Sequence, residues 1–311
     1  MSDAAAIPPA RKAGYRLFGR SFDFLLHMRP AEWPIMAAHT ALGYLLAVGL
    51  AGARAGAHLG PALGGLALWV ICLNGGTLAI NSAFDRDEGD VAYLRKPPPP
   101  PRGLFAFGLA VMGAGQAGAL LLGVPFALAY AFCFLLSVLY SVPPARLKAV
   151  AGADWLINVI GFGAMTPLAG WLATGLPLRI PETIGMLGFA PLFGALYPLT
   201  QLYQLEEDRR RGDRTFAVVL GPRSSLVVAI TCMGVAFVMF GIAGFAAGWV
   251  EEPGAWRWGL LGLAFAAWVL LLVPWLRRAA RLPASAHQRG MYLALGAWAL
   301  TDAVVLAAWW G

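Results

Sequence analysis

The feature that most limits the fold of this chain is a series of long apolar segments. Nine of them approach or exceed the roughly 20 helical residues needed to cross the hydrocarbon core of a bilayer. They are residues 31–54, 62–84, 104–123, 125–141, 155–174, 184–205, 224–248, 256–276 and 291–310. Backbone polar groups find no water inside lipid, and these segments lack the alternation of barrel strands, so each is predicted to be a helix.

The composition supports this prediction. Only 13% of the 311 residues are charged, whereas soluble domains carry about 25%. We therefore predict an all-α, polytopic membrane protein with nine transmembrane helices arranged around a central cavity.

The positions of lysine and arginine predict how the helices are oriented. With the N-terminus inside, the outer loops contain only Arg54, Arg179 and Arg257, and the other twenty of the 23 basic residues lie on the inner side. The net charge of +7 thus reflects topology, and no nucleic-acid recognition motif accompanies it. We predict a bacterial-type inner-membrane protein with a cytoplasmic N-terminus, an external C-terminus, lipid contacts and no nucleic-acid partner.

The first thirty residues form a separate segment in this prediction. Residues 1–30 are expected to be cytoplasmic, and Tyr15 to Arg29 are expected to form an amphipathic helix on the inner membrane surface. Residues 31–311 would form the transmembrane domain.

Two polar decamers interrupt the apolar pattern and share one skeleton. The first is NSAFDRDEGD, residues 81–90, and the second is QLEEDRRRGD, residues 204–213. In each, a carboxamide stands four residues before Asp-Arg, so Asn81 and Asp85 would share one helix face, as would Gln204 and Asp208. Because the decamers follow the second and sixth spans, they indicate two four-helix halves plus a ninth helix. A site is expected where such halves meet.

The chemistry of the decamers predicts a metal site. Clustered carboxylates in a partly dehydrated cavity repel one another unless cations neutralise them. Arg86 and Arg209 could do so locally. The alternative is magnesium, which prefers carboxylate and carboxamide oxygens and shares its coordination with phosphates.

These motifs resemble a known family. The patterns NxxxDRxEGD and YQLEEDRRRGDRTFAVVLG are similar to the two signature motifs of the UbiA superfamily of intramembrane prenyltransferases, and the segment YSVPPARLK after the fourth span also matches. The resemblance implies magnesium, as two ions, bound to the diphosphate of an isoprenoid donor. It implies metal ligands Asn81, Asp85, Gln204, Glu207 and Asp208, and diphosphate-binding residues Arg146, Lys148 and Arg214.

The chain departs from the family pattern at two positions. Gly89 stands where the first motif usually has a second aspartate, and Gln204 stands where the second motif usually begins with one. The acids that could compensate in the first motif are Asp87, Glu88 and Asp90. In the second motif they are Glu206 and Glu207.

The resemblance implies a prenyltransferase that moves an isoprenoid group from a polyprenyl diphosphate to a lipophilic, aromatic acceptor. Asp85 and Asp208 would be catalytic. Asp154 could act on the acceptor, or it could cap a helix. An intramembrane terpene cyclase without a separate acceptor is the alternative. A transporter is a third class, disfavoured because the acids lie at one membrane face rather than at mid-depth.

Overall fold

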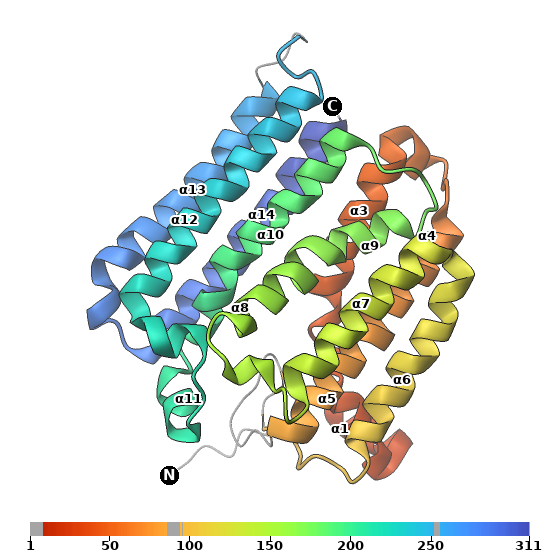
Figure 1. Cartoon of the computed structure of the whole chain (residues 1–311), viewed down its shortest axis with the longest axis vertical. Helices are drawn as coiled ribbons and strands as arrows, with labels where there is room; N and C mark the ends of the chain where they lie inside the picture. Colours follow the sequence, from red (N-terminus) through yellow and green to blue (C-terminus); the bar gives the residue numbers. More distant parts are fainter. Residues whose placement is uncertain (1–8, 86–93, 95, 252–255, 311) are drawn as a thin grey trace.

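The computed structural model describes residues 9–85, 94, 96–251 and 256–310. Within these ranges, nine helical stretches are long and apolar enough to cross a membrane, which confirms the predicted fold class. They lie side by side in Figure 1. The short helices before the first stretch are α1 (Pro9–Phe18), η1 (Gly19–Ser21) and α2 (Phe22–His27).

The first four stretches form one half of the molecule. They are α3 (Trp33–Arg54); α4 (Leu59–Ala67), η2 (Leu68–Asn74) and α5 (Gly75–Asp85) in series; α6 (Leu104–Ala119) with η3 (Leu120–Leu122); and α7 (Val124–Ser141). A short helix, η4 (Leu147–Ala149), leads to the other half.

The remaining stretches form the second half and the ninth helix. They are α8 (Ala153–Asn158), η5 (Val159–Met165) and α9 (Thr166–Leu172) in series; α10 (Ile180–Gln201); α12 (Phe216–Ala246); α13 (Trp256–Arg278) with η6 (Ala279–Arg281); and α14 (Ala284–Trp310). Between α10 and α12 lies the short helix α11 (Leu205–Arg211).

The two halves meet where α3 packs against α9. A Cβ atom added to Gly43 would lie 1.7 Å from the carbonyl oxygen of Pro167, and one added to Gly170 would lie 1.8 Å from that of Thr40. No side chain fits at either position, so both glycines are required for this contact. Close backbone approach through small residues is the usual way membrane helices pack.

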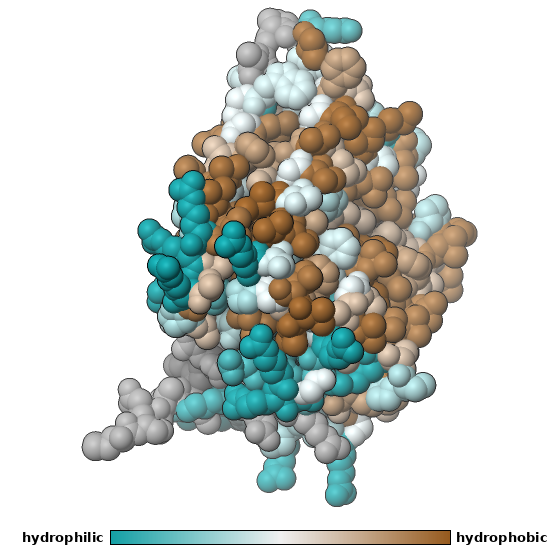
Figure 2. Space-filling view, turned by 60° about the vertical axis from the view of Figure 1, so that its left-hand side comes forward, coloured by the Kyte–Doolittle hydropathy of each residue, from teal (hydrophilic) through white to brown (hydrophobic). Residues whose placement is uncertain are grey.

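Charged and apolar surfaces are separated along the molecule. α3 ends, and α10 and α13 begin, at the upper end of Figure 1, and these ends carry Arg54, Arg179 and Arg257. The helix α11 and the loop with η4 lie at the lower end. Figure 2 shows hydrophilic residues gathered at the lower end below a mostly hydrophobic face. The described residues thus separate the charges as the sequence predicted.

The expected helix boundaries on either side of the second motif differ from the structure. The sixth span ends at Gln201 rather than 205, and turn residues separate it from α11. The seventh begins at Phe216 rather than 224, but Gly221 (φ 75°) followed by Pro222 breaks it near the expected start. Proline has no N–H for the helix ladder, and positive φ is costly for other residues, so this pair interrupts α12.

The predicted amphipathic helix over Tyr15 to Arg29 is not continuous. Gly19, at φ 56°, begins the turn η1 that separates α1 from α2. Leu17 and Phe18 are exposed, as expected for lipid contact, whereas Leu26 is buried and Phe24 packs edge-on against Phe107 of α6. The second part of this segment therefore packs on the helix bundle.

Candidate functional site

A cavity of about 820 Å³ lies between the two halves of the bundle. Its lining contains residues of both decamers: Asn81 and Asp85 from the end of α5, and Gln204, Glu207 and Asp208 around α11. The structure therefore brings the two motifs to one cavity, as the repeat predicted.

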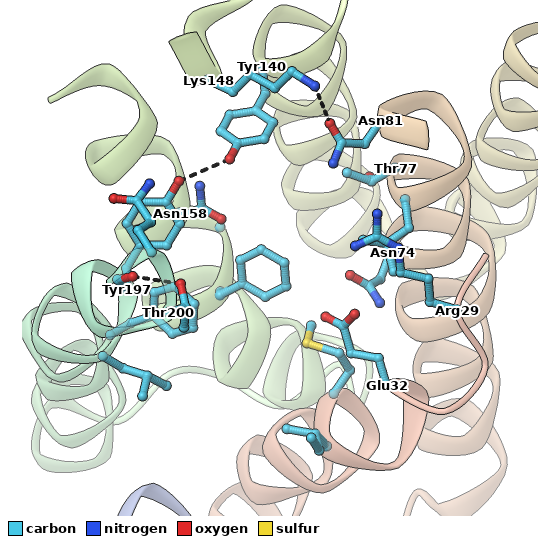
Figure 3. A pocket seen from close by; sticks show the side chains of 18 of the residues that line it. Arg29, Glu32, Asn74, Thr77, Asn81, Tyr140, Lys148, Asn158, Tyr197 and Thr200 are labelled. Atoms are coloured by element: carbon cyan, nitrogen blue, oxygen red, sulfur yellow. Dashed lines mark hydrogen bonds between the residues drawn. The ribbon is translucent and has the colours of Figure 1, made fainter. Parts of the chain in front are cut away.

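Basic side chains from the connection between α7 and α8 hold the first motif. The Lys148 ammonium donates to the Asn81 amide oxygen at 2.6 Å and also to the Asp85 carboxylate. Figure 3 shows Lys148 pointing toward Asn81. Lys148 is 9% exposed, so it is a buried cation whose charge is balanced by Asp85. Arg146 contacts the same carboxylate oxygen at 3.5 Å.

The second motif is joined to the first through the same arginine. Arg146 donates to Asp213 at 3.0 Å, and Arg211 reaches the other oxygen of Asp213 at 3.5 Å. Arg211 also donates to Asp208 at 2.8 Å. A continuous chain of opposite charges therefore runs from Asp85 to Asp208. Sequence reasoning assigned no role to Arg211 or Asp213.

The local fold of α11 explains why Gly-Asp ends the second motif. Gly212 adopts φ 76°, its N–H bonds to the Arg209 carbonyl at 3.1 Å, and the N–H of Asp213 bonds to the Asp208 carbonyl at 3.0 Å. This pair of bonds is a Schellman C-cap, which needs a left-handed residue that glycine supplies without strain. The turn places Asp213 next to Arg211. The Gly-Asp pair in the sequence was the signal for this contact.

Burial and hydrogen bonding act in opposite directions on Asp208. Burial raises the pKa of its carboxyl group, whereas the Arg211 guanidinium and the Thr215 hydroxyl, which donates at 3.3 Å, lower it. Burial is the largest of these effects, so the pKa of Asp208 is raised, and the Arg211 cation opposes that rise.

Gln204 does not continue the sixth span, as we expected it to. It is the N-cap residue of α11, and its backbone carbonyl accepts from the Asp208 N–H at 2.9 Å. Its side chain donates to the Tyr203 hydroxyl at 3.2 Å. Glu207 accepts from Arg211 at 3.4 Å. The two decamers therefore share spacing and cavity but differ in their helices.

Away from the acids, the cavity walls become aromatic. The hydroxyls of Tyr140 and Tyr197 lie 3.0 Å apart, and Figure 3 shows both side chains on one wall near Asn158. Phe162 and Phe193 stack deeper in the cavity with ring centroids 5.3 Å apart. This arrangement gives the cavity a charged end and an aromatic wall.

Comparison with known proteins assigns this architecture. The sequence model of the UbiA prenyltransferase family matches residues 41–296. This chain belongs to that family. Comparison with curated protein sequences gave no significant match.

Several solved structures share the fold. A UbiA homologue from Archaeoglobus fulgidus bound to DMAPP and Mg²⁺ superposes with a TM-score of 0.66 at 18% identity, covering 91% of this chain and 99% of that one. Its complex with GPP and Mg²⁺ gives 0.62 at the same identity and coverage. A digeranylgeranylglyceryl phosphate synthase gives 0.67 at 13% identity, covering 93% and 98%. At these identities the likeness shows the fold.

Three of the predicted site residues do not line the cavity themselves. Arg146 is one, but it bonds to Asp85 and Asp213, which do line it. Arg214 is exposed and forms an isolated backbone bridge with Val150. Asp154 is fully buried, and its carboxylate accepts from the Gly152 N–H, the Gln201 amide and the Phe216 N–H, each at 2.9 Å. With three donors already bound, Asp154 is placed to hold structure rather than to act on a substrate.

The oxygen donors at the cavity suit a hard divalent cation. Carboxylate and amide oxygens of both motifs face one cavity, which is the donor type magnesium prefers. Within the described ranges, no three acidic, histidine or cysteine side chains cluster closely enough to hold an ion alone. The candidate acids Asp87, Glu88 and Asp90 lie outside the described residues. The donors present therefore fit an ion that shares its coordination with a phosphate and water.

Proposed function

We propose that this protein transfers an isoprenoid group from a polyprenyl diphosphate to a lipophilic, aromatic acceptor within the membrane. The observation that carries the proposal is the chain of charges from Asp85 to Asp208 beside a cavity that is lined largely by apolar and aromatic residues. A diphosphate needs cations, and an isoprenoid tail needs an apolar channel. Relatives of the same fold bind DMAPP or GPP with Mg²⁺.

The metal would be held by the oxygen donors of the two motifs. These are Asn81, Asp85, Gln204, Glu207 and Asp208, and we propose two magnesium ions. Bound magnesium would neutralise the negative charge that develops on the leaving diphosphate.

Lys148 and Arg146 would neutralise the diphosphate from the side of the protein. Both already lie within reach of Asp85, and Lys148 is buried. A fixed cation in a dehydrated site acts on developing negative charge without the cost of reorganising solvent. Arg214 is not included, since its side chain is exposed and does not line the cavity, whereas Arg146 bonds to Asp85 and Asp213, which do.

The aromatic wall would protect the reacting carbon. When the carbon–oxygen bond to diphosphate breaks, the electron pair leaves with the diphosphate and an allylic cation remains. The rings of Tyr140 and Tyr197 line the cavity and can face such a cation. An electron pair of the acceptor then forms the new bond, and the acceptor loses a proton. Tyr203, near the same end of the cavity lining, could add a third ring.

We propose that the charged end faces the cytoplasm of a bacterial-type inner membrane. The excess of lysine and arginine at this end supports that orientation, with the C-terminus outside. In this proposal residues 1–30 form the interfacial N-terminal segment, and residues 31–311 form the UbiA-like catalytic domain.

Purified protein in lipid nanodiscs tests the proposal. With geranyl diphosphate, Mg²⁺ and a panel of lipophilic aromatic acceptors, we expect diphosphate release and a prenylated product. Asp85→Ala and Asp208→Ala should each lower turnover at least about 100-fold, since each removes a major electrostatic contribution. The matched control is Glu251→Ala, an exposed acid after α12.

The alternatives give different results in the same assay. A cyclised hydrocarbon formed without an acceptor would indicate a terpene cyclase instead of a transferase. Full activity in either aspartate variant would disprove the proposed metal and diphosphate site. Flux across sealed vesicles without diphosphate release would indicate a transporter.

A further inference from the structure

A second polar group of side chains lines the cavity away from the diphosphate end. Glu32, the N-cap residue of α3, and Asn74, the last residue of η2, both face the cavity. Figure 3 shows the Glu32 carboxylate and the Asn74 amide pointing toward one another, with Arg29 beside them.

The position of Asn74 separates this group from the proposed metal site. Asn74, Thr77, Asn81 and Asp85 all line the cavity along one helical wall. Asn74 precedes Asn81 by two helical turns, which places it about 10 Å deeper along the axis. The group formed by Glu32 and Asn74 therefore lies beyond the diphosphate, beside the path of the reacting carbon.

The polar atoms of the two residues are complementary and unsatisfied. Asn74 is 5% exposed, yet its Nδ2 atom makes no hydrogen bond to any described residue, and the same holds for Oε2 of Glu32. Buried polar atoms without partners are rare in folded proteins and point to a bound molecule. One of these atoms is a donor and the other an acceptor.

The local charge favours a hydrogen-bond donor as the ligand. Burial is the larger effect and raises the pKa of Glu32, and the nearby Arg29 guanidinium opposes that rise. Arg29 is itself anchored to the Ser82 hydroxyl at 3.5 Å. The Arg29 cation favours the carboxylate form of Glu32, in which Oε2 can only accept.

We propose that Glu32 and Asn74 form a hydroxyl-binding site for the acceptor. A hydroxyl group satisfies both atoms at once, since it donates its proton to Glu32 Oε2 and accepts from Asn74 Nδ2. The isoprenoid tail is a hydrocarbon and can do neither. This inference rests on the function proposed above and names the group by which the second substrate is recognised.

Equilibrium binding to the purified protein in nanodiscs tests the site without turnover. The probes are 4-nonylphenol and its methyl ether, 4-nonylanisole, which differ only in the donating hydroxyl. The wild-type protein should bind the phenol about tenfold more tightly, because a hydrogen bond to a charged group contributes at least that much.

Substitutions assign the preference to the two residues. Glu32→Leu and Asn74→Leu should each reduce it to about twofold or less, and Glu32→Gln should retain part of it because the amide oxygen still accepts. The matched control is Thr77→Val: this hydroxyl also lines the cavity, but it donates to the Leu73 carbonyl at 2.7 Å. The control should keep the tenfold preference.

Geranyl diphosphate affinity, measured with Mg²⁺ on the same samples, reports folding and should be unchanged in all four variants. Equal binding of phenol and ether by the wild type overturns the site and indicates a buried water between the two residues. A leucine variant that keeps the preference also overturns it. Absence of prenyl transfer by the wild type would instead disprove the proposed function. It would not change the result of the binding test.

Discussion

The two decamers have the same skeleton, but the protein supports them differently. Asn81 and Asp85 lie on the last turn of a helix that continues from the second span, and their partner Lys148 is more than sixty residues away. Asp208 lies on a short separate helix, and its partner Arg211 is three residues away. The first motif is therefore held by tertiary contacts, and the second is held largely by its own turn.

The second motif also depends on a clamp at its base. The Asp154 carboxylate binds both Gln201, where α10 ends, and the Phe216 N–H, where α12 begins. Gln201 in turn accepts from the Ala217 N–H at 3.0 Å. These bonds close the segment from residue 202 to 215 and satisfy N–H groups at the start of α12 that would otherwise lack partners. We therefore expect that removing a partner distant in sequence lowers stability more than removing a partner within the same turn.

The largest effect is expected for Lys148→Met. This change leaves Asp85 without its buried cation and Asn81 without its donor, and removing one member of a buried pair typically costs about 3–5 kcal/mol. We expect a loss of that size in the free energy of unfolding, measured by chemical unfolding in mixed micelles. The control is Lys12→Met, an exposed lysine on α1, which should change stability by less than about 0.5 kcal/mol. Similar stability for both variants would contradict the conclusion that the Lys148 contacts hold the first motif.

Asp154→Ala should have the next largest effect. Three donors lose their acceptor, and we expect a loss of about 2–4 kcal/mol because unsatisfied buried groups cost about 1–3 kcal/mol each and relax in part. Well below the unfolding temperature, kcat should stay within about threefold of the wild type, since this carboxylate lies outside the cavity lining. Unchanged stability combined with lost kcat would restore a catalytic role for Asp154.

The comparison also explains which features could be predicted from the sequence. The membrane spans follow from long apolar runs, because lipid permits only helices there. The shared cavity follows from the repeat at one membrane face. The turn before α11 could not be seen, because residues 184–205 continue to read as one apolar helix.

Contacts between distant residues were the other limit. The role of Asp154 depends on Gln201 and Phe216, and no local pattern links these three positions. The same is true of Glu32 and Asn74, which lie on different spans. By contrast, the Gly-Asp pair at residues 212 and 213 was visible in the sequence, and its meaning as a helix C-cap follows from glycine chemistry alone.

Substitution of the two carboxamides should lower kcat/KM to extents that differ by about tenfold. Asn81 accepts from the Lys148 ammonium at 2.6 Å, whereas Gln204 donates to the neutral Tyr203 hydroxyl. Bonds to charged groups contribute about 1.5–3 kcal/mol and neutral ones about 1 kcal/mol. We expect Asn81→Leu to lower kcat/KM for the prenyl diphosphate by about 50-fold and Gln204→Leu by about fivefold. Equal losses would mean that the two amides act as equivalent metal ligands. They would contradict the inferred difference between the two motifs.

The smallest effect is expected for Arg211→Met. Its side chain is 34% exposed, so solvent screens its bond to Asp208, and Asp208 keeps the Thr215 hydroxyl as a donor. We expect a loss of about 1 kcal/mol or less at neutral pH. Arg209→Met is the matched control, because Arg209 lies 3.8 Å from the exposed Glu206 and does not contact Asp208 in any described bond.

The pH dependence of that loss tests its cause. Without the Arg211 cation the pKa of Asp208, already raised by burial, should rise further. A carboxyl group with a raised pKa is least costly to the fold when it is protonated, so the difference between Arg211→Met and the wild type should be largest at neutral pH. It should shrink as the pH falls through the pKa of Asp208. Unfolding at two pH values measures this difference, and a loss that stays constant would assign Arg211 a packing role instead of an electrostatic one.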